Sequence, residues 1–353
     1  MEYCRLGNSG LEVSRLGLGA IPLGSVLNRE ESEQVLARFE EAGGNLIDTA
    51  NIYGGGTRGT HTERAGTSER MVGAVTKGKR DRFVIASKAC WSMEDDVRPN
   101  DHGLSRATLT RHLEGSLTRL QTDYLDLYQC HCIDPYTPIE ETIRVMDDFV
   151  RAGKIRYVGV SNWDGWQVVK ANAFAAFHGL SPLLSNQIWY NLADRSPEFS
   201  IIPACRDQKV SIIVWGALAQ SFLTGRFTRE NPPNTGSRFD SAKEGEMCSW
   251  DVLDQNRNWE TLAAVQRVAS LHGTAPPVVA MRWLLQAGTA DVVLLGCSRV
   301  EQFEESLTVA NVILDDDAMT LLRRTSDPCP HPYPNCCWEV FVHEDSPCYG
   351  GVR

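Results

Sequence analysis

Short apolar runs alternate with amphipathic segments along most of the chain, and this alternation limits the fold more than any other feature. The apolar runs have the length of buried strands and fall near residues 16–20, 45–48, 82–87, 124–129, 155–160, 183–187, 210–215 and 292–295. Helical periodicity covers residues 30–43, 68–77, 105–120, 138–152, 164–177, 197–208, 256–272, 276–287 and 300–311. Eight strands alternating with helices predict an α/β protein, either a closed parallel barrel or a long doubly wound sheet.

Two observations favour the barrel. Acidic, basic and aromatic residues follow many different strands, whereas the site of a doubly wound sheet gathers at one switch point. The chain also lacks a Gly-x-Gly-x-x-Gly motif opening a helix, because Gly17-Leu18-Gly19 is followed by Pro22 at the third glycine position. We therefore expect a (β/α)8 TIM barrel, which must hold any dinucleotide in another way.

Other segments are expected to flank this barrel. Residues 3–16 have the pattern of an N-terminal β-hairpin, and the long loops 54–67 and 216–250 would lie at the C-terminal mouth. After Asp327 the chain is rich in Pro and Cys and loses its periodicity. We expect a single barrel domain over residues 1–327 and an irregular tail over residues 328–353.

Three of the expected strands lead to side chains with chemical function. The run 45–48 ends on Asp48 and is followed by a turn that presents Tyr53. The run 82–87 delivers Lys88, and the run 124–129 leads to His131. Because the carboxyl ends of barrel strands collect at one mouth, these four side chains should meet there. An acid, a phenol, an amine and an imidazole suit proton transfer to a carbonyl group.

Each of the four residues has a simpler explanation when it is taken alone. Asp48 could cap a strand, Lys88 could be a solvated charge, and Tyr53 could be a packed aromatic. His131, between two cysteines, could be a core histidine or a metal ligand. Only their joint placement at strand ends favours a catalytic site.

The charge balance excludes some partners. The chain has 35 Lys and Arg against 45 Asp and Glu, a net charge of −10, and shows no basic stripe. Such a chain is a poor candidate for binding nucleic acid or anionic membranes. No signal sequence or membrane-spanning run is present, so a cytoplasmic location is the default expectation.

Eleven cysteines are distributed in two ways. Cys90, Cys130, Cys205 and Cys297 lie in or beside apolar runs and are expected to be small buried residues in a reducing compartment. The tail carries Cys329, Cys336, Cys337 and Cys348, whose spacing does not match that of a zinc site. We expect no metal.

Five segments, in this order, carry a resemblance to a known family. They are Asn45-Leu-Ile-Asp-Thr-Ala-Asn-Ile-Tyr-Gly54, Ser87-Lys88, and residues 120–131, 153–162 and 296–306. In these segments the chain resembles the aldo-keto reductase superfamily, and within it the bacterial and potassium-channel-β-subunit-like branch, over residues 3–325. The resemblance implies a (β/α)8 barrel that uses NADPH to reduce aldehydes, ketones or sugars, or that catalyses the reverse reaction.

The resemblance also implies roles for the four strand-end residues. Tyr53 would be the general acid that protonates the carbonyl oxygen. Lys88 would tune the phenol, whose ordinary pKa is about 10, towards neutrality. Asp48 would fix Lys88, and His131 would orient the carbonyl and stabilise the oxyanion.

A cofactor site follows from the same resemblance. Ser161, Asn162 and Gln187 would bind the nicotinamide carboxamide, with Trp215 stacked on the ring and Asp48 nearby. The pyrophosphate path would run along Gly19, Ala20, Gly216, Ala217, Leu218 and Arg226. The adenosine end would be held by Arg238, Gly296, Ser298, Arg299, Gln302 and Glu305. Because arginine can fork onto a 2′-phosphate, we expect NADPH/NADP in preference to NADH.

The chain departs from the family pattern in four places. Gly216-Ala217 stands where this branch usually has Ser-Pro, and Ser306 stands at a position that is often Asn. The loop after Tyr53 is about ten residues longer than usual. The tail has four cysteines.

The leading hypothesis is an NADPH-dependent reductase of a small-molecule carbonyl. Two alternatives stay open: a cofactor-binding regulatory or redox-sensing protein with slow turnover, and a barrel lyase in which Lys88 forms a Schiff base. Trp91, Trp163, Trp189 and Trp338 suit an aromatic substrate pocket or core packing equally. The substrate and the oligomeric state are not indicated by the sequence.

Overall fold

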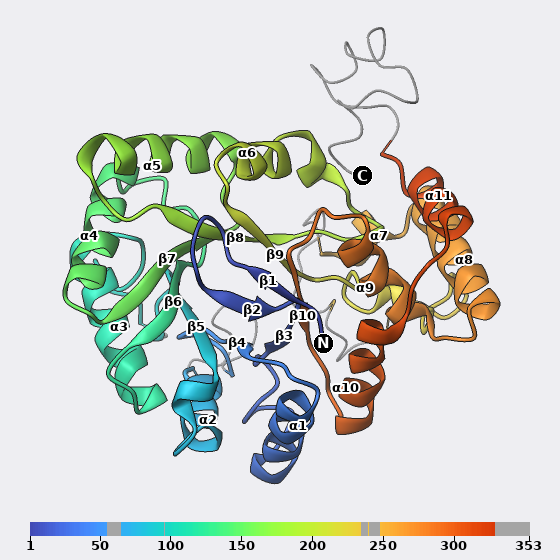
Figure 1. Cartoon of the computed structure of the whole chain (residues 1–353), viewed down its shortest axis with the longest axis horizontal. Helices are drawn as coiled ribbons and strands as arrows, with labels where there is room; N and C mark the ends of the chain where they lie inside the picture. Colours follow the sequence, from blue (N-terminus) through green and yellow to red (C-terminus); the bar gives the residue numbers. More distant parts are fainter. Residues whose placement is uncertain (55–64, 95, 234–238, 240–247, 329–353) are drawn as a thin grey trace, which may run out of the picture.

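A closed barrel of eight parallel strands forms the centre of the computed structural model, which describes residues 1–54, 65–94, 96–233, 239 and 248–328 (Figure 1). The strands are β3 (Leu16–Gly19), β4 (Leu46–Asp48), β5 (Val84–Ala89), β6 (Leu125–Cys130), β7 (Ile155–Ser161), β8 (Leu183–Trp189), β9 (Ser211–Trp215) and β10 (Val292–Leu295). Each strand pairs with its neighbour in the chain, and β10 closes the ring on β3. The expected (β/α)8 barrel is confirmed.

Helices surround the barrel (Figure 1). They are α1 (Arg29–Glu41), α2 (Thr67–Val75), α3 (Arg106–Leu120), α4 (Ile139–Arg151), α5 (Gly165–His178), α6 (Ile201–Asp207), α7 (Trp250–Leu253), α8 (Asn256–Leu271), α9 (Pro276–Gln286), α10 (Val300–Leu307) and α11 (Asp316–Thr325). Asp315 caps α11, because its side chain accepts from the N–H of Ala318 at 2.8 Å.

Two of the predicted helices differ in extent. The segment 197–208 is divided into a 3₁₀ turn (Ser196–Phe199) and α6, because Ser200 between them has φ −139° and ψ −54°. The segment 300–311 ends as an α-helix at Leu307 and continues as a 3₁₀ turn (Thr308–Asn311). The short helix α7 was not predicted; it begins at Trp250, where the predicted long loop 216–250 ends.

The N-terminal hairpin closes one end of the barrel. Its strands β1 (Tyr3–Arg5) and β2 (Glu12–Ser14) pair antiparallel, and Leu6 and Val13 pack against apolar side chains inside the strand ends. Gly7 has φ +55°, and a Cβ there would lie 2.5 Å from the carbonyl oxygen of Leu184. Only glycine allows this close approach, so the hairpin seals the amino-terminal end and leaves the opposite mouth for a site.

Residues two apart on a strand point to the same side, so every second residue of each strand faces the interior of the barrel. Apolar residues occupy this face near the hairpin, and polar or aromatic residues follow two positions later. The pairs are Leu46 and Asp48, Ala86 and Lys88, Leu127 and Gln129, and Ile213 and Trp215, whereas on β8 the buried polar Ser185 precedes Gln187. The barrel interior therefore changes from an apolar plug to a polar mouth.

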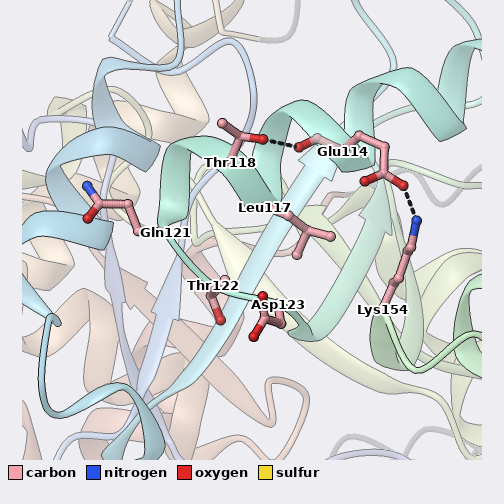
Figure 2. Close-up of a pocket in the computed structure, with 7 residues that line it drawn as sticks. All are labelled: Glu114, Leu117, Thr118, Gln121, Thr122, Asp123 and Lys154. Atoms are coloured by element: carbon pink, nitrogen blue, oxygen red, sulfur yellow. Dashed lines mark hydrogen bonds and ion pairs between the residues drawn. The ribbon is translucent and has the colours of Figure 1, made fainter.

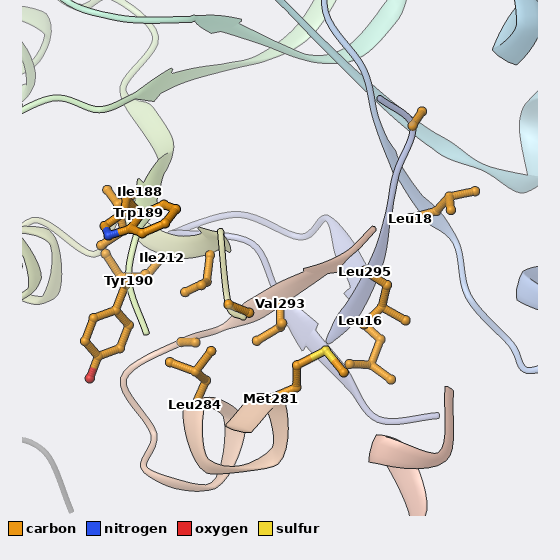
Figure 3. Packing of buried hydrophobic residues seen from close by; sticks show 14 of the residues in the cluster. Leu16, Leu18, Ile188, Trp189, Tyr190, Ile212, Met281, Leu284, Val293 and Leu295 are labelled. Carbon is orange, nitrogen blue, oxygen red and sulfur yellow. The ribbon is translucent and has the colours of Figure 1, made fainter. Parts of the chain in front are cut away.

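Packing between the barrel and α9 holds the strands that reach this mouth. Figure 3 shows Leu16 of β3 and Val293 of β10 beside Met281 and Leu284 of α9. The same cluster includes Leu18 of β3, Leu295 of β10, Ile188 of β8 and Ile212 of β9. All are buried. Burying an aliphatic side chain of this size contributes about 1.5–3 kcal/mol, so the strand ends have a rigid support.

Other expectations are settled by burial. Cys90, Cys130, Cys205 and Cys297 are buried, as predicted. Trp163 and Trp189 are core residues, Trp91 is 42% exposed, and Trp338 lies outside the described residues. Much of the loops 54–67 and 216–250 and nearly all of the tail also lie outside them, so the domain division at residue 327 stays a prediction. No helix within the described ranges is long and apolar enough to cross a bilayer.

Candidate active site

Three of the four predicted residues form one hydrogen-bonded chain at the polar mouth. The Lys88 ammonium donates to Asp48 Oδ2 at 2.6 Å, to the Thr49 carbonyl oxygen at 2.9 Å and to the Tyr53 hydroxyl at 2.9 Å. These three acceptors use all the donors of an ammonium group. Lys88 is fully buried and Asp48 nearly so. The expectation that these side chains meet is confirmed.

Burial and charge set the protonation of this chain. Burial lowers the pKa of Lys88, but Asp48 and Tyr53 outweigh it, and the net pKa lies above the ordinary value. For Tyr53, burial raises the pKa, Lys88 lowers it and Asp48 raises it, and the net direction is upward. Lys88 lowers the pKa of Tyr53 as expected of a nearby cation, but burial outweighs it in the protein alone. Tyr53 is a neutral phenol that can donate a proton.

His131 completes the group. Its ring lies edge-on to Tyr53, with centroids 5.5 Å apart, and contacts Trp91 at 4.4 Å. Burial and the nearby Lys88 charge hold the pKa of His131 well below its usual range, so the imidazole is neutral. Its Nδ1 is buried without a hydrogen-bond partner among the described residues. A neutral imidazole has one N–H group and can donate a hydrogen bond to an oxygen while it stays uncharged.

The second oxygen of Asp48 has partners of its own. Oδ1 accepts from Gln187 Nε2 at 2.8 Å and from Gln129 Nε2 at 3.0 Å. Gln187 was predicted to bind the cofactor, and in the structure its side-chain amide also donates a hydrogen bond to the Asp48 carboxylate. Gln129 was missed by the sequence reasoning. The available signal was a polar residue two positions before His131 on the interior face of a buried strand.

The residues expected at the nicotinamide contact one another. Trp215 donates from Nε1 to Asn162 Oδ1 at 3.0 Å, and Asn162 Nδ2 donates to Ser161 Oγ at 3.0 Å and to the His131 carbonyl oxygen at 3.1 Å. Ser161 Oγ donates to the Gln187 carbonyl oxygen at 2.8 Å. Asn162 adopts φ +57°, which asparagine tolerates. The structure therefore brings Ser161, Asn162, Gln187 and Trp215 together beside His131.

The departure at Gly216 has a packing cause. Gly216 has φ +70°, and a Cβ there would lie 2.3 Å from the Trp189 ring. Any larger residue would displace Trp189, which also packs edge-on against Trp215. Ala217 is buried and Leu218 half-buried in the same turn. Across the mouth, Ala20 follows β3 and its N–H donates to the Asp48 carbonyl oxygen at 2.8 Å, while Gly19 pairs with Asp48.

The residues expected at the adenosine end are more exposed. Ser298 donates to Gln302 Oε1 at 2.8 Å, and exposed Arg299 precedes α10. Gly296, Glu305 and Arg226 are also exposed, and the Arg226 guanidinium lies 4.9 Å from the Phe227 ring. Arg238 lies outside the described residues. Within the described ranges, neither Arg226 nor Arg299 has an ion-pair partner, which leaves both charges available to an anion.

Two other features are separate from this site. Figure 2 shows a surface hollow lined by polar residues of α3 and the segments before β6 and β7, including Gln121, Asp123 and Lys154. Strands β6 and β7 begin there, so the hollow is at the end opposite the mouth. No group of three or more His, Cys, Asp or Glu residues in the described part of the chain lies together as a metal site requires.

Comparison with known proteins agrees with this geometry. The profile of the aldo/keto reductase family matches residues 15–327. The chain is 34% identical to the aldo-keto reductase YhdN of Bacillus subtilis, over 93% of this chain and 96% of that protein. It is 30% identical to a probable voltage-gated potassium channel subunit beta of Oryza sativa, over 89% and 92% of the two chains. It is also 30% identical to the norsolorinic acid reductase stcV of Emericella nidulans, over 88% and 77%.

Proposed function

The chain belongs to the aldo/keto reductase family and is an NAD(P)H-dependent oxidoreductase, and from this premise we propose that it uses NADPH to reduce an aldehyde, ketone or sugar carbonyl, with Tyr53 as the proton donor. The reverse oxidation uses the same residues. The substrate is a small molecule.

The observation that carries this proposal is the hydrogen bond of 2.9 Å between the Lys88 ammonium and the Tyr53 hydroxyl. The ammonium is fixed by Asp48, so its charge stays beside the phenol when a proton leaves. A phenolate formed there would be stabilised by a cation already in place, which lowers the cost of proton transfer. Neutral His131, whose ring faces Tyr53, would hold the carbonyl oxygen beside that hydroxyl.

The residues around the mouth fit a nicotinamide cofactor. Asn162, Gln187 and Trp215 offer two amides and an aromatic ring, with Gln187 bonded to Asp48, and Arg226 and Arg299 offer exposed charges. Bound there, the cofactor would supply the hydride. We assign Asn162 and Gln187 to the carboxamide, Trp215 to the ring, and Arg299 with Arg238 to a 2′-phosphate, which favours NADPH over NADH.

Tyr53→Phe tests the proton-donor role. The variant keeps the ring and loses the hydroxyl, so kcat should fall about 100- to 10,000-fold while the Kd for NADPH changes little. Steady-state reduction of 4-nitrobenzaldehyde and a tryptophan-fluorescence titration measure the two quantities. Unchanged turnover in the variant would show that another group donates the proton.

Cofactor choice is tested by separate titrations with NADPH and NADH, followed by tryptophan fluorescence. Tighter saturable binding of NADPH supports the assignment of the arginines. Equal Kd values for NADPH and NADH would contradict a contact between these arginines and the 2′-phosphate. No binding of either nucleotide would overturn the reductase proposal.

The two alternatives from the sequence make different predictions. A Schiff base needs a neutral amine, whereas Lys88 is held charged by Asp48, so borohydride should trap no carbonyl compound on Lys88. A regulatory protein with slow turnover would bind NADPH and complete few cycles. Sustained turnover on the probe aldehyde separates the enzyme from that alternative.

A further inference from the structure

Two thiols lie side by side at the rim of the active site. Cys90 follows β5 and Cys132 follows β6, the two strands that lead to Lys88 and His131. The Sγ atoms are 3.1 Å apart and share a thiol hydrogen bond. The strands beneath are in register, with Lys88 opposite Gln129, and the His131 N–H donates to the Ala89 carbonyl oxygen at 3.0 Å.

The two thiols differ in exposure and in charge environment. The shared hydrogen bond lowers the pKa of Cys132, and the same bond together with burial raises the pKa of Cys90. Cys90 is buried, whereas Cys132 is half-buried. A disulfide reagent from solvent therefore reaches Cys132 first, and Cys90 lies in contact to resolve the product.

We propose that Cys90 and Cys132 form a redox-active dithiol site that takes low-molecular-weight disulfides and closes into an intramolecular disulfide. The Cys132 thiolate attacks one sulfur of the disulfide RSSR, a mixed disulfide forms, and one RS⁻ leaves. The Cys90 thiol then loses its proton to this RS⁻ and attacks the Cys132 sulfur, which expels the second RS⁻. The protein loses two electrons and the reagent gains them, giving two thiols after solvent protonates the second leaving group.

We expect closure of this bond to disturb the active site. The sulfur atoms are 3.1 Å apart, and a disulfide bond is about 2.05 Å long, so the two sulfur atoms must approach by about 1 Å, and we expect the two loops to follow. His131 precedes Cys132, Trp91 follows Cys90, and their rings are in contact. A displacement of about 1 Å at a positioning residue can cost about 100-fold in rate. This effect on turnover rests on the proposed function, whereas bond formation does not.

The experiment treats the full-length reduced protein with glutathione disulfide and maps the product by peptide mass spectrometry. We expect the peptide with Cys90 to be joined to the peptide with Cys130 and Cys132. Cys132→Ser should abolish this link, and Cys130→Ala should keep it. No link, a stable mixed disulfide on Cys132, or a link that survives Cys132→Ser would each overturn the proposal.

Turnover of 4-nitrobenzaldehyde with NADPH is measured on the same samples, each relative to its own reduced form. Oxidised wild type should lose at least about tenfold in kcat/KM and recover with dithiothreitol, while Cys132→Ser, which lacks the attacking thiol, should be insensitive. Cys4→Ser is the matched control, because Cys4 is half-buried in strand β1 of the hairpin at the other end of the barrel, and it should behave as wild type. A linked protein with unchanged kcat/KM would overturn the coupling to His131. If the reduced protein shows no turnover, the proposed function fails, and the peptide link alone decides the dithiol site.

Discussion

The inner and outer ends of the proposed cofactor site are built in opposite ways. At the inner end, every donor of Lys88 and both oxygens of Asp48 have protein partners, and both side chains are buried. At the outer end, Arg226 and Arg299 are exposed and have no ion-pair partner among the described residues. Reaction chemistry needs charges fixed before the substrate arrives. A phosphate brings its own charge, so exposed arginines suffice to anchor it.

The largest effect is expected from removing the Lys88 ammonium, the cation of the inner end. Lys88→Met leaves Asp48 buried without its counter-ion, so the free energy of unfolding should fall by about 3–5 kcal/mol. Tyr53 would also lose its hydrogen-bonded cation, and kcat/KM should fall about 100- to 1,000-fold. Urea unfolding and turnover of the probe aldehyde measure the two effects.

Lys79→Met is the matched control for this change. Lys79 pairs with Glu40 at 2.8 Å, but both side chains are about a third exposed. An ion pair of that kind contributes about 0–1 kcal/mol, because water already solvates its charges. Equal losses in the two variants would show that Lys88 is an ordinary structural charge.

A second test removes the hydrogen bond that the Gln129 amide donates to the Asp48 carboxylate. Gln129→Leu has a similar volume but cannot donate to Asp48, and a hydrogen bond to a charged group contributes about 1.5–3 kcal/mol. We expect a stability loss of that size and a loss of about tenfold in kcat/KM. Gln208→Leu is the control, because Gln208 makes a comparable bond to Asp207 at the protein surface. A stability loss without any change in kcat/KM would make Gln129 purely structural.

Gln129 also shows what the sequence could and could not provide. Strand and helix periodicity predicted the barrel, and the strand ends predicted that Asp48, Lys88 and Tyr53 meet, because covalent order and parallel pairing fix where strands end. Periodicity carries no information on which oxygen of Asp48 an amide reaches. It also could not show that Trp189 occupies the space beside Gly216, or that burial outweighs Lys88 at Tyr53. These depend on side-chain packing between distant strands.

A third test uses pH. His112 is buried against the inner end, where its Nδ1 is 2.6 Å from Asn51 Nδ2, and burial lowers the pKa of His112 to about 4. The unfolded chain, with a His pKa of about 6.5, binds the proton more readily, so stability falls as pH drops from about 6.5 towards 4. At pH 5 the loss due to His112 should be about 2 kcal/mol.

The measurement compares urea unfolding at pH 7.5 and pH 5 for wild type and His112→Gln. The variant should lose about 2 kcal/mol less than wild type over this interval, since glutamine cannot titrate. Parallel pH dependences would mean that His112 accepts a proton in the folded protein as easily as in the unfolded chain. The inner end would then be less isolated from water than its burial indicates.

The smallest expected effect belongs to the outer end and gives the sharpest contrast. Arg299→Ala should raise the Kd for NADPH about tenfold, or about 1.4 kcal/mol, and leave the Kd for NADH and the unfolding free energy nearly unchanged. Because the side chain is exposed, added salt should weaken NADPH binding to wild type more than to the variant. Arg324→Ala, an exposed arginine of α11, is the control for net charge. An equal loss of affinity for NADPH and NADH would mean that Arg299 contacts a part that both nucleotides share. A lower free energy of unfolding would mean that the outer end, like the inner one, is organised before the ligand binds.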